Sequence, residues 1–249
     1  MLAAQRRDLL LERLRTDGRV IAKDLAAELD LSEDSIRRDL RDLAAAGLCQ
    51  RVYGGALPVS PAIVDYGARR DVEVSGKQRV AAVAAELVAP GSTAIIDGGT
   101  TALAVVRALP LDLRATVVTH SPTVASALAD HQAVDVYLIG GRLFKHSMVS
   151  CGAAAVEAAR GLHADVFLLG VTGVHPEAGL TTGDADEAAM KRALARQAAD
   201  TYVLASSEKI GAASRFSVLP LTEVAGVITD ASADNPTVRE LGVPVIHAP

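Results

Sequence analysis

Apolar residues in the first part of the chain recur at helical spacing. In residues 5–14 and again in residues 22–29, leucines stand four positions apart, which places them on one face of a helix. The pattern predicts two helices over these ranges. Ser32 is a favourable N-cap for a third helix, and Gly47 is a natural residue for its C-terminal end.

The third predicted helix has two distinct faces. At about 100° per residue, Ile36, Leu40 and Leu43 fall within one apolar arc. The far side presents three guanidinium groups, those of Arg37, Arg38 and Arg41. Two helices, a tight turn and a third helix are typical of a helix-turn-helix, whose recognition helix enters the major groove of DNA. Arginine suits both phosphate contact and the bidentate reading of guanine.

A short β-prone run follows this helix. Residues 48–56 are interrupted by Gly54 and Gly55, which favour a turn. The run predicts a two-stranded wing with Arg51 and Tyr53 near its tip.

The arginine face also allows a second interpretation. Arginines on the outside of a helix often form only a solvated surface. Asp39 and Asp42 stand close enough in the sequence to neutralise them. Periodicity alone does not choose between the two interpretations.

Beyond residue 58, short runs rich in β-branched residues alternate with helical runs. Most are continuously apolar, as expected for strands buried on both faces, and the alternation indicates an α/β domain with a mostly parallel sheet. Helix starts are predicted from a capping box at Ser75–Gln78 before Arg79–Val88, from Ser121–Pro122 and from Asp184–Glu187. The predicted strands are Ala94–Asp97, Thr116–Thr119, Val134–Gly140, Asp165–Gly170, Thr201–Ala205, Val224–Thr229 and Val243–Ile246.

Charge is unevenly distributed, and the change supports a domain boundary. Residues 1–57 hold ten Lys+Arg and ten Asp+Glu, whereas residues 58–249 hold 15 and 20 and carry the whole formal charge of −5. Pro58 and Pro61 interrupt regular structure at the junction. The predicted division is a winged helix-turn-helix at 1–57, a linker at 58–74 and an α/β domain at 75–249.

Composition excludes several classes of protein. With 50% hydrophobic residues and a charge of only −5, the chain is not disordered. No apolar run reaches the ~18–20 residues of a membrane span, and charged residues near the start oppose a signal peptide. Two cysteines are too few for a disulfide framework, so we expect a cytoplasmic protein with no membrane partner. The acid excess opposes coating of nucleic acid along the whole chain but allows a local contact.

Four small-residue loops follow predicted strands, where parallel α/β sheets bind their ligands. In the first, Asp97 precedes Gly98 and Gly99, and Thr100 and Thr101 open a helix whose N-terminus favours an anion. None of the four matches a Walker loop or a dinucleotide motif, so no nucleotide cofactor is predicted. Together the loops indicate a pocket for a small phosphorylated ligand. The other three are Thr119, His120 and Ser121; Gly140 and Gly141; and residues 170–173.

Lys191 and Lys209 are candidate cations for this ligand. Each has an ordinary alternative. Glu187 and Lys191 are spaced i,i+4 and can pair on a helix surface, and Lys209 lies in a polar stretch typical of loops. Asp97 can likewise close its own turn with a side-chain hydrogen bond.

Two regions resemble the DeoR family of bacterial transcription regulators. In the first region, residues 20–40 include Ser35-Ile-Arg-Arg-Asp-Leu40, and Gly54-Gly55-Ala56 follows in the wing. Residues 77–230 resemble the sensor domain of the family. The matching segments there are 96–101, 118–121, 138–141 and 179–182, together with Glu187, Lys191 and Lys209.

The resemblance implies a sensor similar in fold to ribose-5-phosphate isomerase, in a family whose members sense phosphorylated sugars or related metabolites. Two residues of the sensor region depart from the family pattern: His120 replaces an Asn, and Ser206 replaces an Asp. Both are expected to face the pocket, which leaves open a ligand other than a common sugar phosphate. His120 either adds a donor that titrates near pH 6–7 or acts as a neutral hydrogen-bonding substitute.

The isomerase-like fold raises an enzyme alternative. Isomerisation needs a positioned carboxylate base and a stabilising partner, and several acidic residues are available, but a fold does not carry a function. We therefore expect no enzyme and no catalytic residues. No histidine pair has i,i+4 spacing and the cysteines form no Cys-x-x-Cys, so no metal site is expected.

The sequence predicts a transcriptional repressor controlled by a phosphorylated metabolite. Because one recognition helix reads few base pairs, the working unit is expected to be a homodimer or homotetramer on double-stranded operator DNA. The predicted DNA contacts are Ser32, Ser35, Arg37, Arg38, Arg41, Arg51, Tyr53 and Gly54. The predicted effector contacts are Asp97, Gly98, Gly99, Thr100, Thr101, Thr119, His120, Ser121, Gly140, Gly141, Glu187, Lys191 and Lys209.

Overall fold

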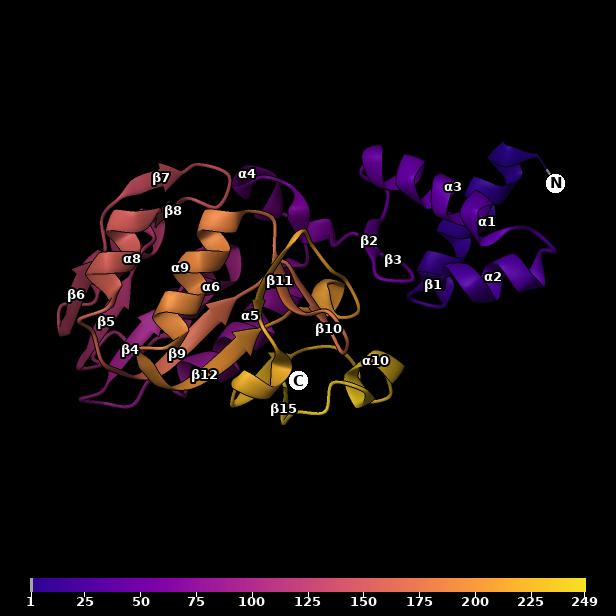
Figure 1. Cartoon of the computed structure of the whole chain (residues 1–249). Helices are drawn as coiled ribbons and strands as arrows, with labels where there is room; N and C mark the ends of the chain where they lie inside the picture. Colours follow the sequence, from indigo (N-terminus) through magenta and orange to yellow (C-terminus); the bar gives the residue numbers. More distant parts are fainter. Residues whose placement is uncertain (1) are drawn as a thin grey trace.

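The computed structural model describes residues 2–249, and its chain folds into two parts (Figure 1). We call residues 2–57 the head, residues 58–74 the arm and residues 75–249 the body. The head is a cluster of helices with short strands. The body is a larger α/β layer structure, and the arm runs from one to the other (Figure 1).

Three helices form most of the head, as predicted. They are α1 (Ala3–Thr16), α2 (Ala22–Glu28) and α3 (Glu33–Ala45). Ser32 is the N-cap of α3, and its hydroxyl accepts a hydrogen bond from the backbone N–H of Ser35 at 3.3 Å. Gly47 follows the helix with φ of +75°, a conformation that glycine adopts without strain.

A small antiparallel sheet completes the head. Strands β2 (Gln50–Val52) and β3 (Gly55–Leu57) form the predicted wing. A third strand, β1 (Val20–Ile21), pairs with the other edge of β3. The sequence pattern did not predict β1, because two residues are too few to show an alternation.

A buried carboxylate links two helices of the head. Asp39 of α3 is 3% exposed and accepts a hydrogen bond from Arg6 of α1. Arg7 lies 3.5 Å from Asp39 and bonds to the exposed Asp42 at 2.5 Å. Both aspartates are therefore partners of α1. They do not neutralise the arginine face of α3, as the second interpretation of the sequence supposed.

The arm contains two short helical turns, η1 (Pro61–Ile63) and α4 (Tyr66–Arg69). The next helix, α5 (Val74–Ala85), begins before the expected capping box, so this predicted start is wrong. Its N-cap is Glu73, which makes no side-chain cap bond. The first turn of α5 packs closely on the rest of the body, since a Cβ on Gly76 would lie 2.5 Å from the Asp230 carboxylate.

Seven strands form one fully parallel sheet in the body, which confirms the predicted fold class. Their spatial order is β15-β14-β12-β9-β4-β5-β6, and each predicted strand is present within a few residues. The bounds are β4 (Thr93–Ile96), β5 (Ala115–Thr119), β6 (Val134–Leu138), β9 (Ala164–Gly170), β12 (Ala198–Leu204), β14 (Gly226–Thr229) and β15 (Val245–His247).

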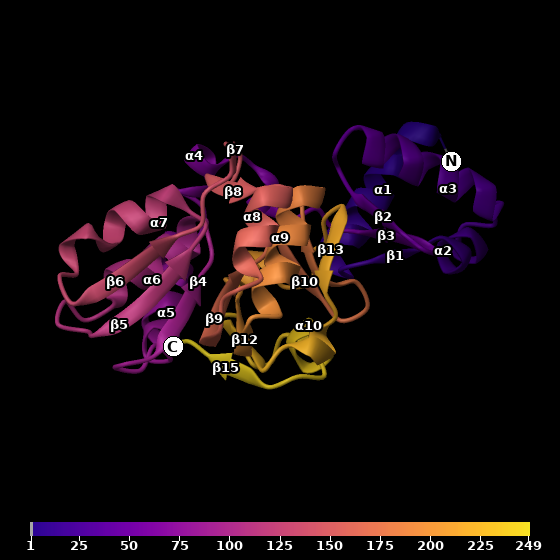
Figure 2. The same cartoon turned by 60° about the vertical axis from the view of Figure 1, so that its left-hand side comes forward.

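Helices cover both faces of this sheet (Figure 2). Alternate strand residues point to opposite faces: Ile95 and Phe167 pack with α8 and α9, whereas Ile96 and Leu168 pack with α5, α6 and α7. The two apolar cores explain why the strands read as continuously apolar runs. The helices are α6 (Thr100–Ala108), α7 (Pro122–Ala127), α8 (Ala153–Ala159) and α9 (Ala185–Ala195).

Several short elements lie outside the main sheet and were not predicted. One pair of antiparallel strands is β7 (Arg142–Phe144) with β8 (Val149–Cys151). A three-stranded antiparallel sheet contains β10 (Gly173–His175), β11 (Gly179–Thr182) and β13 (Phe216–Leu219). The remaining elements are η2 (Leu128–Asp130), η3 (Ser207–Lys209), η4 (Leu221–Glu223) and α10 (Pro236–Arg239). Within residues 2–249, no helix is long and apolar enough to cross a membrane.

The buried pair in the head gives a testable expectation. Asp39→Asn removes the charge that faces Arg6, so it should lower the free energy of unfolding of the head by about 1–3 kcal/mol. Asp42→Asn removes an exposed partner and should change it by less than about 0.5 kcal/mol. Urea denaturation followed by amide exchange in α1 and α3 measures both. Equal effects would show that burial of Asp39 is unimportant.

Candidate functional site

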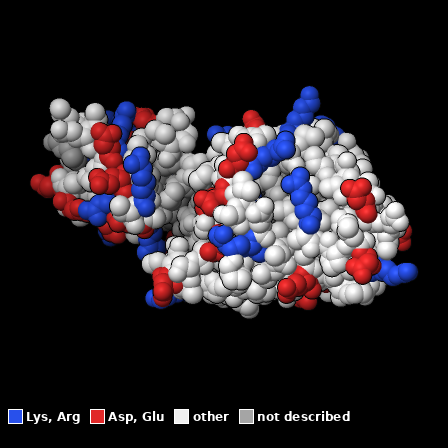
Figure 3. Space-filling view, turned by 180° about the vertical axis from the view of Figure 1, so that it is seen from behind, with Lys and Arg blue, Asp and Glu red and all other residues white. Residues whose placement is uncertain are grey.

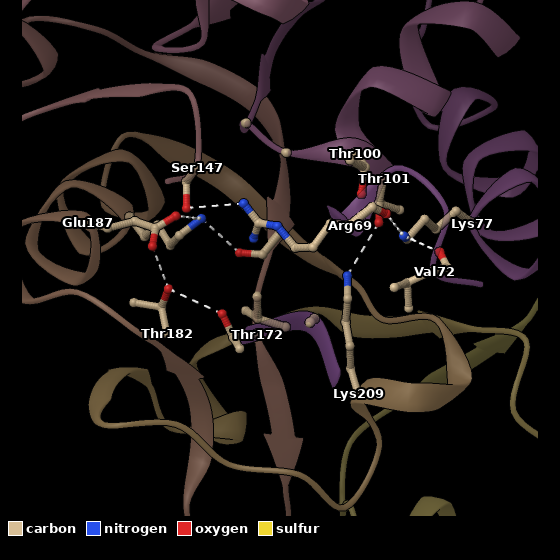
Figure 4. Close-up of a pocket in the computed structure, with 16 residues that line it drawn as sticks. Arg69, Val72, Lys77, Thr100, Thr101, Ser147, Thr172, Thr182, Glu187 and Lys209 are labelled. Atoms are coloured by element: carbon tan, nitrogen blue, oxygen red, sulfur yellow. Dashed lines mark hydrogen bonds and ion pairs between the residues drawn. The ribbon is translucent and has the colours of Figure 1, made fainter. Parts of the chain in front are cut away.

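A small cavity lies at the carboxyl ends of the central strands β4, β9 and β12. This is the edge at which open α/β sheets bind ligands. Its wall combines small residues with several charged side chains (Figure 4). The wall is formed by Ala62, Arg69, Val72, Lys77, Gly98, Gly99, Thr100, Thr101, Ser147, Gly170, Val171, Thr172, Thr182, Glu187, Lys191 and Lys209.

Two glycines bring the start of α6 into this wall. Gly99 has φ of +99°, which side chains rarely adopt. A Cβ on Gly98 would lie 2.0 Å from a methyl group of Val149. Only glycine therefore fits either position. The chain can then turn directly from β4 into α6, and Thr100 and Thr101 lie beside the cavity.

Asp97 lies beneath the wall and is completely buried. Its Oδ1 accepts from the N–H of Gly98 and contacts His120 Nε2, both at 2.7 Å. Its Oδ2 accepts from the N–H of Gly170 at 2.8 Å and from Lys191 Nζ at 2.5 Å. Burial alone would raise the pKa of Asp97, but Lys191 and His120 together hold it well below its usual value.

Glu187 and Lys191 form a buried pair, not the surface pair that their spacing also allowed. Lys191 Nζ lies 3.5 Å from Glu187 Oε1, and both side chains are under 10% exposed. Burial would lower the pKa of Lys191, but the carboxylates of Asp97 and Glu187 raise it. The other oxygen of Glu187 accepts from the hydroxyl of Thr182 at 2.6 Å.

Lys209 has a different environment from Lys191. It is the last residue of η3, the short turn that follows β12. Its Nζ donates to the hydroxyl of Thr101 and to the carbonyl of Leu204, each at 3.3 Å. Both acceptors are neutral. Burial lowers the pKa of Lys209 to about 8. The charge of Glu208 opposes this shift, and the nearby cations Lys77 and Arg69 lower the pKa further.

Several predicted effector residues lie behind the wall or away from it. His120 is fully buried, with Nδ1 at 2.9 Å from the carbonyl of Ser150 and Nε2 on Asp97. Thr119 and Ser121 are fully buried beside it. Gly141 packs against Ala155 of α8, and neither it nor Gly140 is in the wall.

The expectation that His120 and Ser206 face the pocket is therefore wrong. Ser206 is fully buried and donates to Glu208 at 2.8 Å. Because both side chains find partners within the fold, their departure from the family pattern says little about the ligand. The predicted residues that do line the cavity are Gly98, Gly99, Thr100, Thr101, Glu187, Lys191 and Lys209.

Two basic residues of the wall were not predicted. Arg69 comes from the arm and Lys77 from α5, and no motif marks either as a ligand contact. Burial lowers the pKa of both groups. With them, four basic side chains line the cavity against one carboxylate, Glu187, so the wall carries an excess of positive charge.

The head presents the predicted DNA residues on α3 and the wing. Arg37 pairs with Glu33 at 2.6 Å, while Arg38 and Arg41 are exposed. At the wing, Tyr53 is fully exposed and Gly54 forms the turn with φ of +80°. On the face seen in Figure 3, acidic and basic side chains are interspersed over both parts of the chain.

Family models match both parts of the chain. A DeoR-like helix-turn-helix domain matches residues 6–62, and a DeoR C-terminal sensor domain matches residues 72–231. The chain belongs to the DeoR family. It is therefore a transcriptional regulator with a DNA-binding head and a sensor body.

Several DeoR-type relatives are similar over nearly the whole chain. The HTH-type transcriptional regulator GlpR of Haloferax volcanii is 34% identical, over 99% of this chain and 98% of the relative. The glycerol-3-phosphate regulon repressor of Escherichia coli K12 is 30% identical, over 93% and 92%. The HTH-type transcriptional repressor GlcR of Bacillus subtilis is 30% identical, over 92% and 89%.

Two solved structures show more distant similarity. The ribose 5-phosphate isomerase A of Methanocaldococcus jannaschii is 16% identical, with a TM-score of 0.40 over 53% of this chain and 52% of that one. A probable sor operon regulator of Shigella flexneri is 12% identical, with a TM-score of 0.45 over 68% and 90%. Within residues 2–249 of this DeoR-family chain, no three His, Cys, Asp or Glu side chains gather as metal ligands.

The two buried lysines should respond differently to removal. Lys191→Met leaves Asp97 and Glu187 buried without their cation and should destabilise the body by about 3–5 kcal/mol. Lys209→Met removes a cation with neutral partners, so stability should stay the same or rise. Thermal denaturation of the two matched variants tests this. Equal losses would contradict the separate roles of the two lysines.

Proposed function

We propose that this DeoR-family regulator is a repressor whose affinity for operator DNA is controlled by a small phosphorylated metabolite. The observation that carries the proposal is the cavity at the start of α6, where free backbone N–H groups meet an excess of basic side chains. A helix N-terminus with hydroxyls and cations around it is a ready site for a phosphate.

The two sides of the cavity suit two halves of such a metabolite. On one side, Thr100, Thr101 and Lys209 offer donors to a phosphate. On the other, Glu187 and Thr182 offer a carboxylate and a hydroxyl that suit the hydroxyls of a sugar or polyol. The E. coli relative is named for glycerol 3-phosphate, which supports a ligand of this class.

The carboxylates of the site do not suit an isomerase. Asp97 is fully buried, uses both oxygens in four contacts and has a lowered pKa, so it is a poor general base. Asp184 caps α9, and the exposed Asp186 pairs with Arg142. Among the acidic residues that the structure describes, only Glu187 lines the cavity. We therefore propose a sensor without catalysis.

The head is the proposed reader of the operator. Helix α3 places Arg38 and Arg41 on its exposed face, and the wing adds Arg51 and Tyr53. One such helix reads only a few base pairs, and helix-turn-helix proteins commonly bind two half-sites as symmetric dimers. We propose a homodimer or a larger homo-oligomer that acts in the cytoplasm, where its DNA is found.

Arg38 provides a test of the DNA surface. Arg38→Ala should weaken binding to an operator fragment, enriched from random duplexes with the wild-type protein, by about 10- to 100-fold. The control is Arg160→Ala, which removes an exposed arginine of the body that pairs only with Glu157. Fluorescence anisotropy titration measures both variants. If the Arg38→Ala and Arg160→Ala variants bound the operator with equal affinity, α3 would be excluded as the recognition helix.

Ligand binding gives the test of the sensor. In a thermal-shift screen, phosphorylated sugars and polyols such as glycerol 3-phosphate should stabilise the chain, and their dephosphorylated forms should not. The best hit should then change operator affinity by about 5- to 150-fold, the usual size of an allosteric coupling. A screen without a phosphorylated hit would contradict the proposal.

The pH dependence of the best hit tests the role of Lys209. Only protonated Lys209 attracts the phosphate, and its pKa is about 8 in the free protein. Phosphate is a dianion above about pH 6. Affinity should therefore be highest between about pH 6 and 8 and fall as the pH rises further. Calorimetry should show weaker binding and no such fall in Lys209→Gln, and a flat wild-type profile would contradict this role.

A further inference from the structure

The arm is docked on the body along its length. Its first residues meet the segment before β13: Ala213 donates its N–H to the carbonyl of Pro58 at 3.3 Å, and Val59 forms a bridge with Ala213. Ser60 and Ala62 are buried. Ala62 and Arg69 also stand in the cavity wall, so the arm closes one side of the cavity.

Arg69 reaches from the arm into the cavity (Figure 4). Its Nη2 donates to the carbonyl of His146 at 2.9 Å and to the hydroxyl of Ser147 at 3.3 Å. Both acceptors are neutral and lie on the turn between β7 and β8. The Nε of Arg69 is buried and has no hydrogen-bond partner within residues 2–249. A buried donor without a partner is costly, and an anion in the cavity would supply one.

Lys77 of α5 forms hydrogen bonds with the end of the arm. Its Nζ donates to the carbonyl of Arg69 at 2.7 Å and to the carbonyl of Val72. These are again neutral acceptors, so Lys77 is a second cation of the cavity whose charge is not neutralised by a bonded acid. The end of the arm is held in place while the guanidinium of Arg69 keeps unused donors.

We propose that the arm is part of the effector site and that Arg69 is the contact through which a bound phosphate holds the arm on the body. The proposal rests on the sensor function proposed above. A guanidinium and a phosphate are both charged and can form two parallel hydrogen bonds, which makes the pair one of the strong polar contacts in proteins. A phosphate between Thr100, Lys209 and Arg69 therefore bonds to the body and the arm together.

This arrangement couples the ligand to the head. A ligand that contacts both arm and body binds the docked arm more tightly than a displaced one, so it shifts the population towards the docked arm. The arm begins directly after β3 of the wing, and its position limits where the head can lie. The exposed ion pair of Arg19 with Glu177 also joins head and body, but such a surface pair contributes only about 0–1 kcal/mol.

Amide exchange with inorganic phosphate as the probe tests the proposal. In the full-length wild type, phosphate at matched ionic strength should slow exchange both in residues 98–104 and in the arm. Arg69→Gln should lose the slowing in the arm and weaken phosphate binding at least about tenfold. Arg70→Gln, which removes the exposed neighbouring arginine, should behave as the wild type. Arg69→Lys should restore part of the binding, because the charge remains without the Nε donor.

The outcomes separate this proposal from the sensor function itself. If phosphate slowed amide exchange in residues 98–104 but not in the arm, the proposed role of the arm would be overturned and the phosphate site would stand. If phosphate still slowed amide exchange in the arm of the Arg69→Gln variant, the proposed role of Arg69 would be overturned. If phosphate slowed neither region and no phosphorylated compound stabilised the chain, the proposed sensor function would fail first.

Discussion

The cavity depends on one buried carboxylate. Asp97 joins the ends of three strands and a helix, because its oxygens bind the N–H groups of Gly98 and Gly170, the ring of His120 and the ammonium of Lys191. Gly98 follows β4 and His120 follows β5, whereas Gly170 is the last residue of β9 and Lys191 belongs to α9. Four partners offset the cost of burying the charge, which an isolated carboxylate would not tolerate. The start of α6 can therefore lie in a fixed position at the edge of the sheet.

The basic residues around this carboxylate differ in what they are bound to. Lys191 is held by Asp97 and Glu187, and these charges keep its pKa raised despite burial. Lys209 and Arg69 bond only to neutral groups, and burial lowers the pKa of each. A cation that is already paired stabilises the fold. A buried cation without a bonded acid costs free energy in the empty protein, and this cost falls when an anion binds.

Much of the fold could be predicted because its signals are local. The seven apolar runs became one parallel sheet, and Ser32 and Asp184 cap the helices they were expected to cap. The start of α5 was mispredicted: its N-cap is Glu73, in a left-handed backbone conformation and without a side-chain cap bond, instead of Ser75. The loop after β4 was correctly expected to lie at the cavity edge. Tertiary packing alone determines that the His120 side chain points into the protein and that Arg69 of the arm lines the cavity. No local sequence pattern predicts either feature.

The arm changes the physical problem of signal transmission in this family member. If the effector touched only the body, its binding free energy would have to reach the head through the packed sheet. A cavity wall that includes Arg69 places part of that free energy directly on the segment that connects head and body. The donors of Arg69 are incompletely satisfied without an anion, so the docked arm gains most from an occupied cavity. In the proposed arrangement, the same residue links recognition of the phosphate to the position of the wing.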